Sequence, residues 1–186
     1  FGRFFHLMGV CTIATVLALS SGAGQRQVAM FAVERLANNP IVYPGMEGLE
    51  PERGHENING PSLIRVPDWV ENPLGRYYLY FAHHNGTHIR LAYADSLEGP
   101  WRIHTGGVLS VDRAPGRGHI ASPDVHIDGN HRRIRMYFHQ PAPQGSGLQG
   151  QMTWAALSDD GLRFKAREEV LGLFYFRVFE YEGHHY

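Results

Sequence analysis

The feature that most constrains the fold is a repeated pattern of short apolar and aromatic strands separated by turns. In the first copy, residues 76–82 (RYYLYFA) and 89–94 (IRLAYA) are rich in the aromatic and aliphatic side chains that favour strands. An Asn-Gly pair between them favours a tight hairpin. Residues 63–66 supply an apolar strand before this hairpin, and residues 101–103 begin another strand after it. The first copy therefore predicts a four-stranded antiparallel meander.

A second copy follows in the same order, and a third begins at residue 176. The segments of the second copy are residues 121–127 (ASPDVHI), 133–139 (RIRMYFH), 152–161 and 163–165. The repeat is about 60 residues long, and repeated meanders of this kind build β-propellers, in which each sheet is one blade. We therefore expect an all-β chain that supplies about two and a half blades over residues 55–186. Since a ring needs at least about four blades, we expect a fragment of a longer domain; the alternative is a self-contained β-sandwich.

Residues 1–23 have the pattern of an export signal. Arg3 precedes an apolar run over residues 7–19, and small residues follow up to Ala23. The run is too short to span a bilayer, which takes about 20 residues. We expect a secreted or periplasmic protein that makes no membrane contact after the signal is removed. The only cysteine, Cys11, would leave with the signal.

Residues 24–54 are expected to form a leader before the first blade. Residues 27–37 carry a weak helical pattern, and residues 41–43 could form a short strand that closes the ring. The net charge of −1 shows no basic excess of the kind that nucleic-acid-binding proteins have. We therefore expect no nucleic-acid partner.

Candidate site residues follow from the propeller pattern, because first strands line the central axis and ligands bind where several of them begin. The candidates on or beside these strands are Asn59, His83, His84, His119, Asp124 and Arg177. Each also has a purely structural interpretation; an aspartate after a proline can simply bind nearby backbone amides. The chain has 12 histidines, but their spacing matches no common metal motif, so we predict no metal site from spacing.

The blade pattern resembles the five-bladed propellers of the glycoside hydrolase family 43 superfamily. The resemblance rests on GPSLIR, RYYLYF and ADSLEGPW in the first copy and on SPDVHID in the second. It implies that an aspartate of the first blade is the general base, that an aspartate of the second blade tunes and orients the acid, and that a glutamate of the third blade is the acid. Asp124 matches the second-blade aspartate, whereas Gly60 stands where the base is expected. The resemblance requires no cofactor and allows a divalent cation on the axis.

These features predict an exported, glycoside hydrolase-like protein that acts on an oligo- or polysaccharide. Asp124 would be catalytic, and the other five candidates would bind substrate. Because glycoside hydrolysis generally needs two facing carboxylates, the alternative is a non-catalytic carbohydrate-binding propeller that has lost its base. A propeller with a purely structural or interaction role is the third interpretation.

Overall fold

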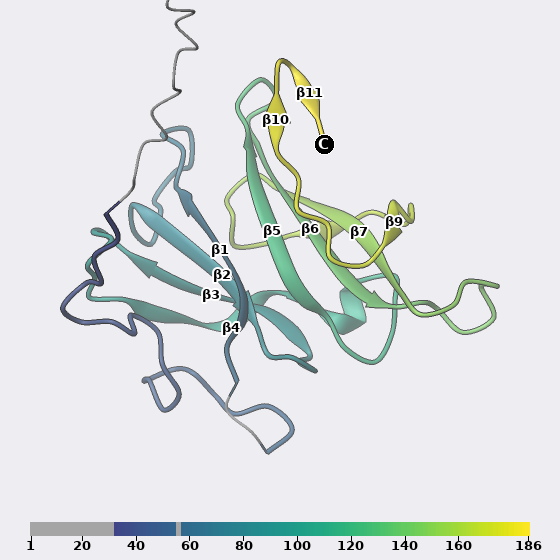
Figure 1. The fold of residues 1–186 in the computed structure, drawn as a ribbon, viewed down its shortest axis with the longest axis horizontal. Helices are drawn as coiled ribbons and strands as arrows, with labels where there is room; N and C mark the ends of the chain where they lie inside the picture. Colours follow the sequence, from purple (N-terminus) through teal and green to yellow (C-terminus); the bar gives the residue numbers. More distant parts are fainter. Residues whose placement is uncertain (1–31, 55–56) are drawn as a thin grey trace, which may run out of the picture. The chain divides into compact units, whose positions relative to one another are not determined.

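The aromatic strands of both copies pair as antiparallel meanders in a computed structural model that describes residues 32–54 and 57–186 (Figure 1). The first sheet has the order β1-β2-β3-β4. Its strands are β1 (Asn59–Arg65), β2 (Tyr77–Ala82), β3 (His88–Ala94) and β4 (Arg102–Ser110). Every connection joins neighbouring antiparallel strands, as predicted from the turns.

The second sheet repeats this order as β5-β6-β7-β8. Its strands are β5 (Ala121–Asp128), β6 (Arg133–Pro141), β7 (Gln151–Ser158) and the short β8 (Lys165–Ala166), while β9 (Gly172–Leu173) also pairs with β7. A single 3-10 turn, η1 (Val111–Arg113), is the one helical element in the described part of the chain. The predicted all-β fold with a four-stranded meander per sheet is confirmed, and the number of blades in a closed ring stays a prediction.

The third copy is less regular than the sequence pattern suggests. The sequence predicts that a third copy of the meander begins at residue 176, but only a small hairpin forms there, from β10 (Glu180–Tyr181) and β11 (His184–His185). Residues 171–179 instead run as an irregular segment beside the second sheet, with the β9 pair as its one ladder contact. This segment supplies much of the site described below.

Strand register confirms that the two sheets are copies. Ser62 lies opposite Tyr80 in the first sheet, and Asp124 lies opposite Tyr137 in the second. Both first strands have a bulge just before this pair. At the bulges, Gly60 and Ser122 both have positive φ angles, +58° and +51°. A bulge re-aims the side chains that follow it, so both copies present their first strands in the same way.

The two sheets pack side by side through one shared apolar core. β1 lies against β5 (Figure 1), and the core contains fully buried residues from both sheets, among them Tyr80, Ile89, Ile134, Met136 and Trp154. The Tyr80 hydroxyl donates a buried 3.0 Å hydrogen bond to the Gly161 carbonyl of the second sheet. Burial of this apolar area is the main stabilising term, at about 25 cal/mol per Å².

The predicted helix of the leader is wrong where the structure describes it, because residues 32–37 are not helical. Residues 41–43 lie in a bend in this chain, and the closing of a ring by this segment stays a prediction. Val42 packs into a second apolar cluster with Phe81 and Trp101 of the first sheet. Residues 27–31 and the predicted export signal at 1–23 lie outside the described residues.

A buried ion pair fixes the end of the leader to the β2–β3 hairpin. Glu52 and Arg90 are 8% and 3% exposed, and the Arg90 guanidinium donates to Glu52 Oε1 at 2.6 and 2.9 Å. Thr87 donates to the same carboxylate from its hydroxyl at 2.9 Å and from its backbone amide. Burial acts to raise the pKa of Glu52, but the Thr87 hydrogen bonds and the charges of His88 and Arg90 outweigh it and hold the pKa below its usual value.

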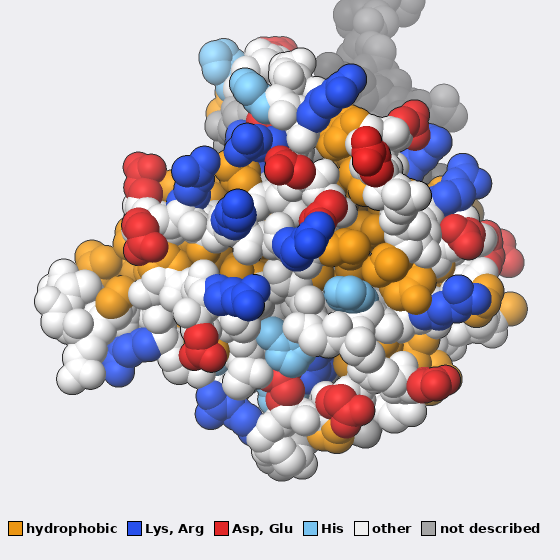
Figure 2. All heavy atoms as spheres, turned by 180° about the vertical axis from the view of Figure 1, so that it is seen from behind, with side chains coloured by type: hydrophobic (Ala, Val, Ile, Leu, Met, Phe, Trp, Pro, Cys, Tyr) orange, Lys and Arg blue, Asp and Glu red, His pale blue; other side chains and the backbone are white. Residues whose placement is uncertain are grey.

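Residues Arg35–Tyr186 form one unit, and the described residues 32–34 belong to another. On the face that Figure 2 shows, acidic and basic side chains are interspersed around areas of hydrophobic side chains. In the described ranges, no helix has the length and apolar character needed to cross a membrane.

Candidate functional site

Two predicted residues of the first sheet lie side by side where β1 begins next to the end of β2. The Asn59 side-chain nitrogen lies 3.3 Å from Nδ1 of His84. The His84 backbone amide donates to the Asn57 side chain at 2.9 Å. Because β1 begins beside the end of β2, the chain places an exposed imidazole and an amide side by side, as donors and acceptors for a polar ligand.

His83 points away from this pair. It is 5% exposed, and its Nδ1 accepts a 3.1 Å hydrogen bond from the Asn85 backbone amide within the turn. Its Cβ also lies close to Gly86, which is next to the Glu52 carboxylate. Neighbouring residues at a strand end face opposite sides, so only one of the two histidines lies beside Asn59, and that one is His84.

A histidine pair belongs to the second sheet. His119 Nε2 lies 3.2 Å from the side-chain oxygen of Gln151, and the His119 ring contacts the His139 ring edge-on with centroids 6.1 Å apart. Burial lowers the pKa of His119, and the charges of His84 and Arg53 add to the effect although the Gln151 bond opposes it. The predicted residue His119 thus lies within electrostatic reach of the first-sheet pair.

The His139 ring contacts both the His119 ring and the aromatic rings of residues 174 and 175. It lies in β6 opposite Ala121 of β5, is 3% exposed and packs against Tyr175 and Phe174, with ring centroids 4.7 and 6.1 Å away. Burial lowers its pKa to about 4, and the charges of His119, Arg177 and His84 act in the same direction. His139 is therefore a neutral imidazole at neutral pH.

Asp124 accepts a hydrogen bond from the third copy of the repeat. Its Oδ2 accepts a 2.8 Å hydrogen bond from the backbone amide of Val178 and lies 2.9 Å from Nε2 of His126. The aspartate side chain is 14% exposed. It is thus a partly buried carboxylate that binds a histidine and a backbone amide distant in the chain, rather than the nearby amides that the structural interpretation of the sequence named.

Arg177 lines a hollow of about 540 Å³ beside Asp124, which we call the Tyr137 hollow. The guanidinium also donates to the Pro123 carbonyl at 3.3 Å. The lining residues are Tyr137, Leu171, Tyr175, Phe176, Arg177, Val178 and Tyr186. Four of the seven are aromatic, and the Tyr137 ring lies 5.9 Å from that of His126, the partner of Asp124. Aromatic faces, an arginine and a nearby carboxylate therefore surround one space.

The sequence interpretation missed His139 and the aromatic residues of this site. A signal existed for His139, because the second copy has a histidine at the position where the first copy has Ala82. Tyr175 and Phe176 had no such signal, since they lie in a segment where the repeat is irregular. Only folding shows that this segment lies over β6.

Metal chemistry has no support in the described part of the chain. No group of three or more His, Cys, Asp or Glu side chains is placed there to hold a metal ion. The described residues therefore offer no ligand set for the axial cation that the resemblance allows, and we derive no step from one.

No family model matches the chain. An uncharacterized protein of Acanthamoeba polyphaga mimivirus is 28% identical over 202 residues, which is 99% of this chain and 54% of that protein. The chain thus spans about half the length of this relative.

Among solved structures, the chain is similar to a GH43_1 enzyme of Xanthomonas citri in complex with xylotriose, with a TM-score of 0.48 and 18% identity over 62% of this chain and 33% of that one. It is also similar to CoXyl43, a GH43 β-xylosidase/α-arabinofuranosidase from a compost microbial metagenome, with a TM-score of 0.48 and 19% identity over 67% of this chain and 38% of that one. Likenesses at this level decide neither substrate nor activity.

Proposed function

We propose that the protein binds a neutral oligo- or polysaccharide in the Tyr137 hollow. The observation that carries the proposal is the lining of this space by four aromatic residues and Arg177. The apolar faces of sugar rings pack on aromatic rings, and a guanidinium donates to hydroxyls in fixed directions. A hollow of about 540 Å³ lies within the usual range for small-ligand sites.

The histidine cluster extends the proposed site. A saccharide in the hollow lies against Tyr175, which packs on the buried His139, and the exposed pair of His84 and Asn59 offers polar groups to a longer ligand. Neutral imidazoles donate one hydrogen bond and accept another, which suits sugar hydroxyls. The secreted or periplasmic location predicted from residues 1–23 is part of this proposal.

The test is calorimetric titration with a panel of neutral trisaccharides of pentoses and hexoses. Removal of the ring in Phe176→Ala or of the charge in Arg177→Gln should weaken binding about tenfold, as loss of one good contact of about 1.4 kcal/mol does. Tyr43→Ala is the matched control, because Tyr43 is also an exposed aromatic residue (48%) but lies outside the hollow. Absence of saturable binding by any sugar, or equal losses in the control, would refute the proposal.

Glycoside hydrolysis is the second candidate, and one observation favours it. Asp124 lies at the rim of the hollow, through its hydrogen bond to Val178, at the position that resembles the second-blade aspartate. Hydrolysis needs a second carboxylate on the other side of the scissile bond, and Gly60 holds the position from which the resemblance expects it. Release of reducing ends that Asp124→Asn abolishes would support an enzyme, whereas saturable binding with no release over hours would support the non-catalytic module.

A further inference from the structure

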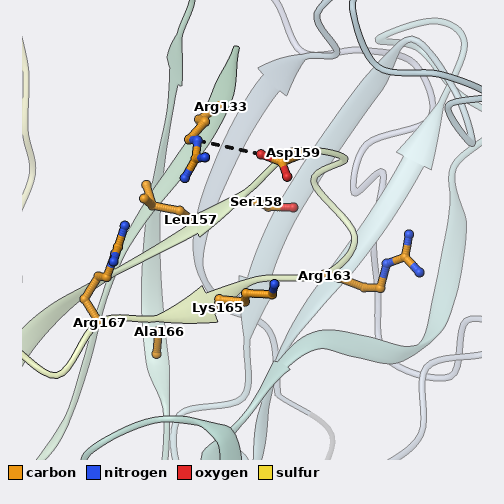
Figure 3. A pocket seen from close by; sticks show the side chains of 8 residues that line it. All are labelled: Arg133, Leu157, Ser158, Asp159, Arg163, Lys165, Ala166 and Arg167. Carbon is orange, nitrogen blue, oxygen red and sulfur yellow. Dashed lines mark ion pairs between the residues drawn. The ribbon is translucent and has the colours of Figure 1, made fainter. Parts of the chain in front are cut away.

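A second hollow, of about 380 Å³, lies where β6 begins and β7 ends (Figure 3). We call it the basic hollow, because four cationic side chains and one carboxylate line it. These are Arg133, Arg163, Lys165, Arg167 and Asp159. Lys165 is the only lysine of the chain. None of these residues belongs to the site described above.

Strand pairing gathers three of these cations on one face of the sheet. Lys165 lies opposite Leu157 in the β7–β8 pair. Arg167 continues this pairing through its backbone amide, which donates to the Ala155 carbonyl at 2.8 Å. Residues two apart on a strand share a face, so Lys165 and Arg167 project together, and Arg133 joins them from β6 on the other side of Leu157 (Figure 3).

The positive charges of this face are only partly compensated. Arg163 is held by Asp160 at 2.8 Å, but Arg133 lies 3.8 Å from Asp159, whose side chain is 84% exposed. An exposed pair of this kind is worth about 0–1 kcal/mol, so a ligand can displace Asp159 at little cost. Lys165 and Arg167 form no ion pair with any residue that the structure describes.

The basic hollow opens onto a larger one. A neighbouring space of about 820 Å³ shares Asp159, Arg163 and Lys165 with it and is also lined by Trp69, Asn72 and the carboxylates of Glu71 and Asp160. The Trp69 indole nitrogen is buried and has no hydrogen-bond partner among the described residues. Anionic groups are therefore favoured in the basic hollow and not in this larger space. Within the basic hollow, Arg133 of β6 and the cations of residues 163–167 can pair with successive anionic groups of one extended ligand, which a single small anion cannot supply.

We propose that the basic hollow binds successive carboxylate or sulfate groups of an anionic polysaccharide. Arginine pairs with such groups through two parallel hydrogen bonds, and lysine adds a point charge. The site is independent of the Tyr137 hollow and takes a different class of sugar.

The test is calorimetric titration of the protein with a short oligogalacturonate at low and at physiological salt. Lys165→Gln and Arg167→Gln should each weaken binding about fivefold, as expected for partly screened charge contacts, and added salt should weaken binding further. Arg65→Gln is the matched control, because Arg65 is exposed on β1, lines neither of these hollows and forms no ion pair with the described residues. Both test side chains are exposed, so the variants should keep the parent's unfolding midpoint.

Three further measurements separate the alternatives. The affinity for a neutral oligosaccharide of the same length should be unchanged by Lys165→Gln. This result also distinguishes the basic hollow from the Tyr137 hollow. Inorganic sulfate and phosphate should bind far more weakly than the oligogalacturonate; equal affinity would show a free-anion site and overturn the proposal. Unchanged oligogalacturonate affinity in both variants would overturn it as well.

Discussion

Ser62 and Asp124 hold the same position in consecutive sheets, and each accepts a hydrogen bond from the backbone of the next copy of the repeat. The Ser62 hydroxyl accepts from Val125 at 2.9 Å, and the Asp124 carboxylate accepts from Val178 at 2.8 Å. This equivalence explains why Asp124 is partly buried: whatever else it does, it joins the second sheet to the segment that follows.

Asp124→Ala should therefore destabilise the protein, by about 1–2 kcal/mol, because the Val178 amide loses its acceptor. Asp124→Ser should lose less than half as much, since a hydroxyl already makes this contact at Ser62. Urea unfolding of the two variants measures the difference. If the Ala and Ser variants have the same free energy of unfolding, the hydrogen bond from Val178 does not stabilise the contact between the second sheet and the segment that follows.

Gly60→Ala should cost about 2 kcal/mol. Gly60 has a φ of +58°, and an added Cβ would lie 2.9 Å from the Cα of Ser122, so the change both strains the backbone and pushes the first strands of the two sheets apart. Gly129→Ala makes the same chemical change at a site where an added Cβ meets no described atom within 4 Å. Chemical denaturation should show a loss for Gly60→Ala alone; equal losses would mean that the approach of the two strands is not tight.

The buried His139 should make stability depend on pH. Its pKa in the folded protein is about 4, below the ordinary value of about 6.5 in the unfolded chain. As pH falls from 6.5 to 4, the imidazole of residue 139 becomes protonated in the unfolded chain but stays neutral in the folded protein. The free energy of unfolding therefore decreases, by on the order of 2–3 kcal/mol. Above pH 6.5 this contribution to stability is fully present.

Thermal unfolding of His139→Leu between pH 4 and pH 7 checks this prediction. The variant should lose the part of the pH dependence that His139 contributes, whatever its stability at pH 7, and His119, whose pKa burial also lowers, should account for part of the remainder. His104→Leu, which changes a histidine of β4 outside the cluster, should keep the full wild-type dependence. A wild-type slope that persists in His139→Leu would assign the effect to another group.

Glu52→Gln should destabilise the protein by about 3 kcal/mol, because it leaves the Arg90 guanidinium buried without its counter-charge. Asp159→Asn removes an exposed partner of an arginine and should change stability by less than about 0.5 kcal/mol. Urea titration of both variants gives the comparison. A small effect of Glu52→Gln would mean that the leader is not held through this pair.

The sequence by itself determined the meanders. The strands, their order and the equivalence of the two copies follow from local composition and turns, because hairpin pairing joins neighbours in the chain. Local patterns could not show that residues 32–37 would not form a helix, or that Val42 would pack on the first sheet, since both depend on burial against distant residues.

The sequence predicted some residues of the candidate site and missed others. Asn59, His84, His119, Asp124 and Arg177 follow from their places in the repeat, but which of His83 and His84 faces Asn59 depends on the turn that Asn85 closes onto His83. The aromatic lining and the basic face were decided by tertiary structure alone. They combine residues that are far apart in the chain, such as Tyr137 with Tyr186 and Arg133 with Arg167, and only strand pairing and sheet packing bring such residues together.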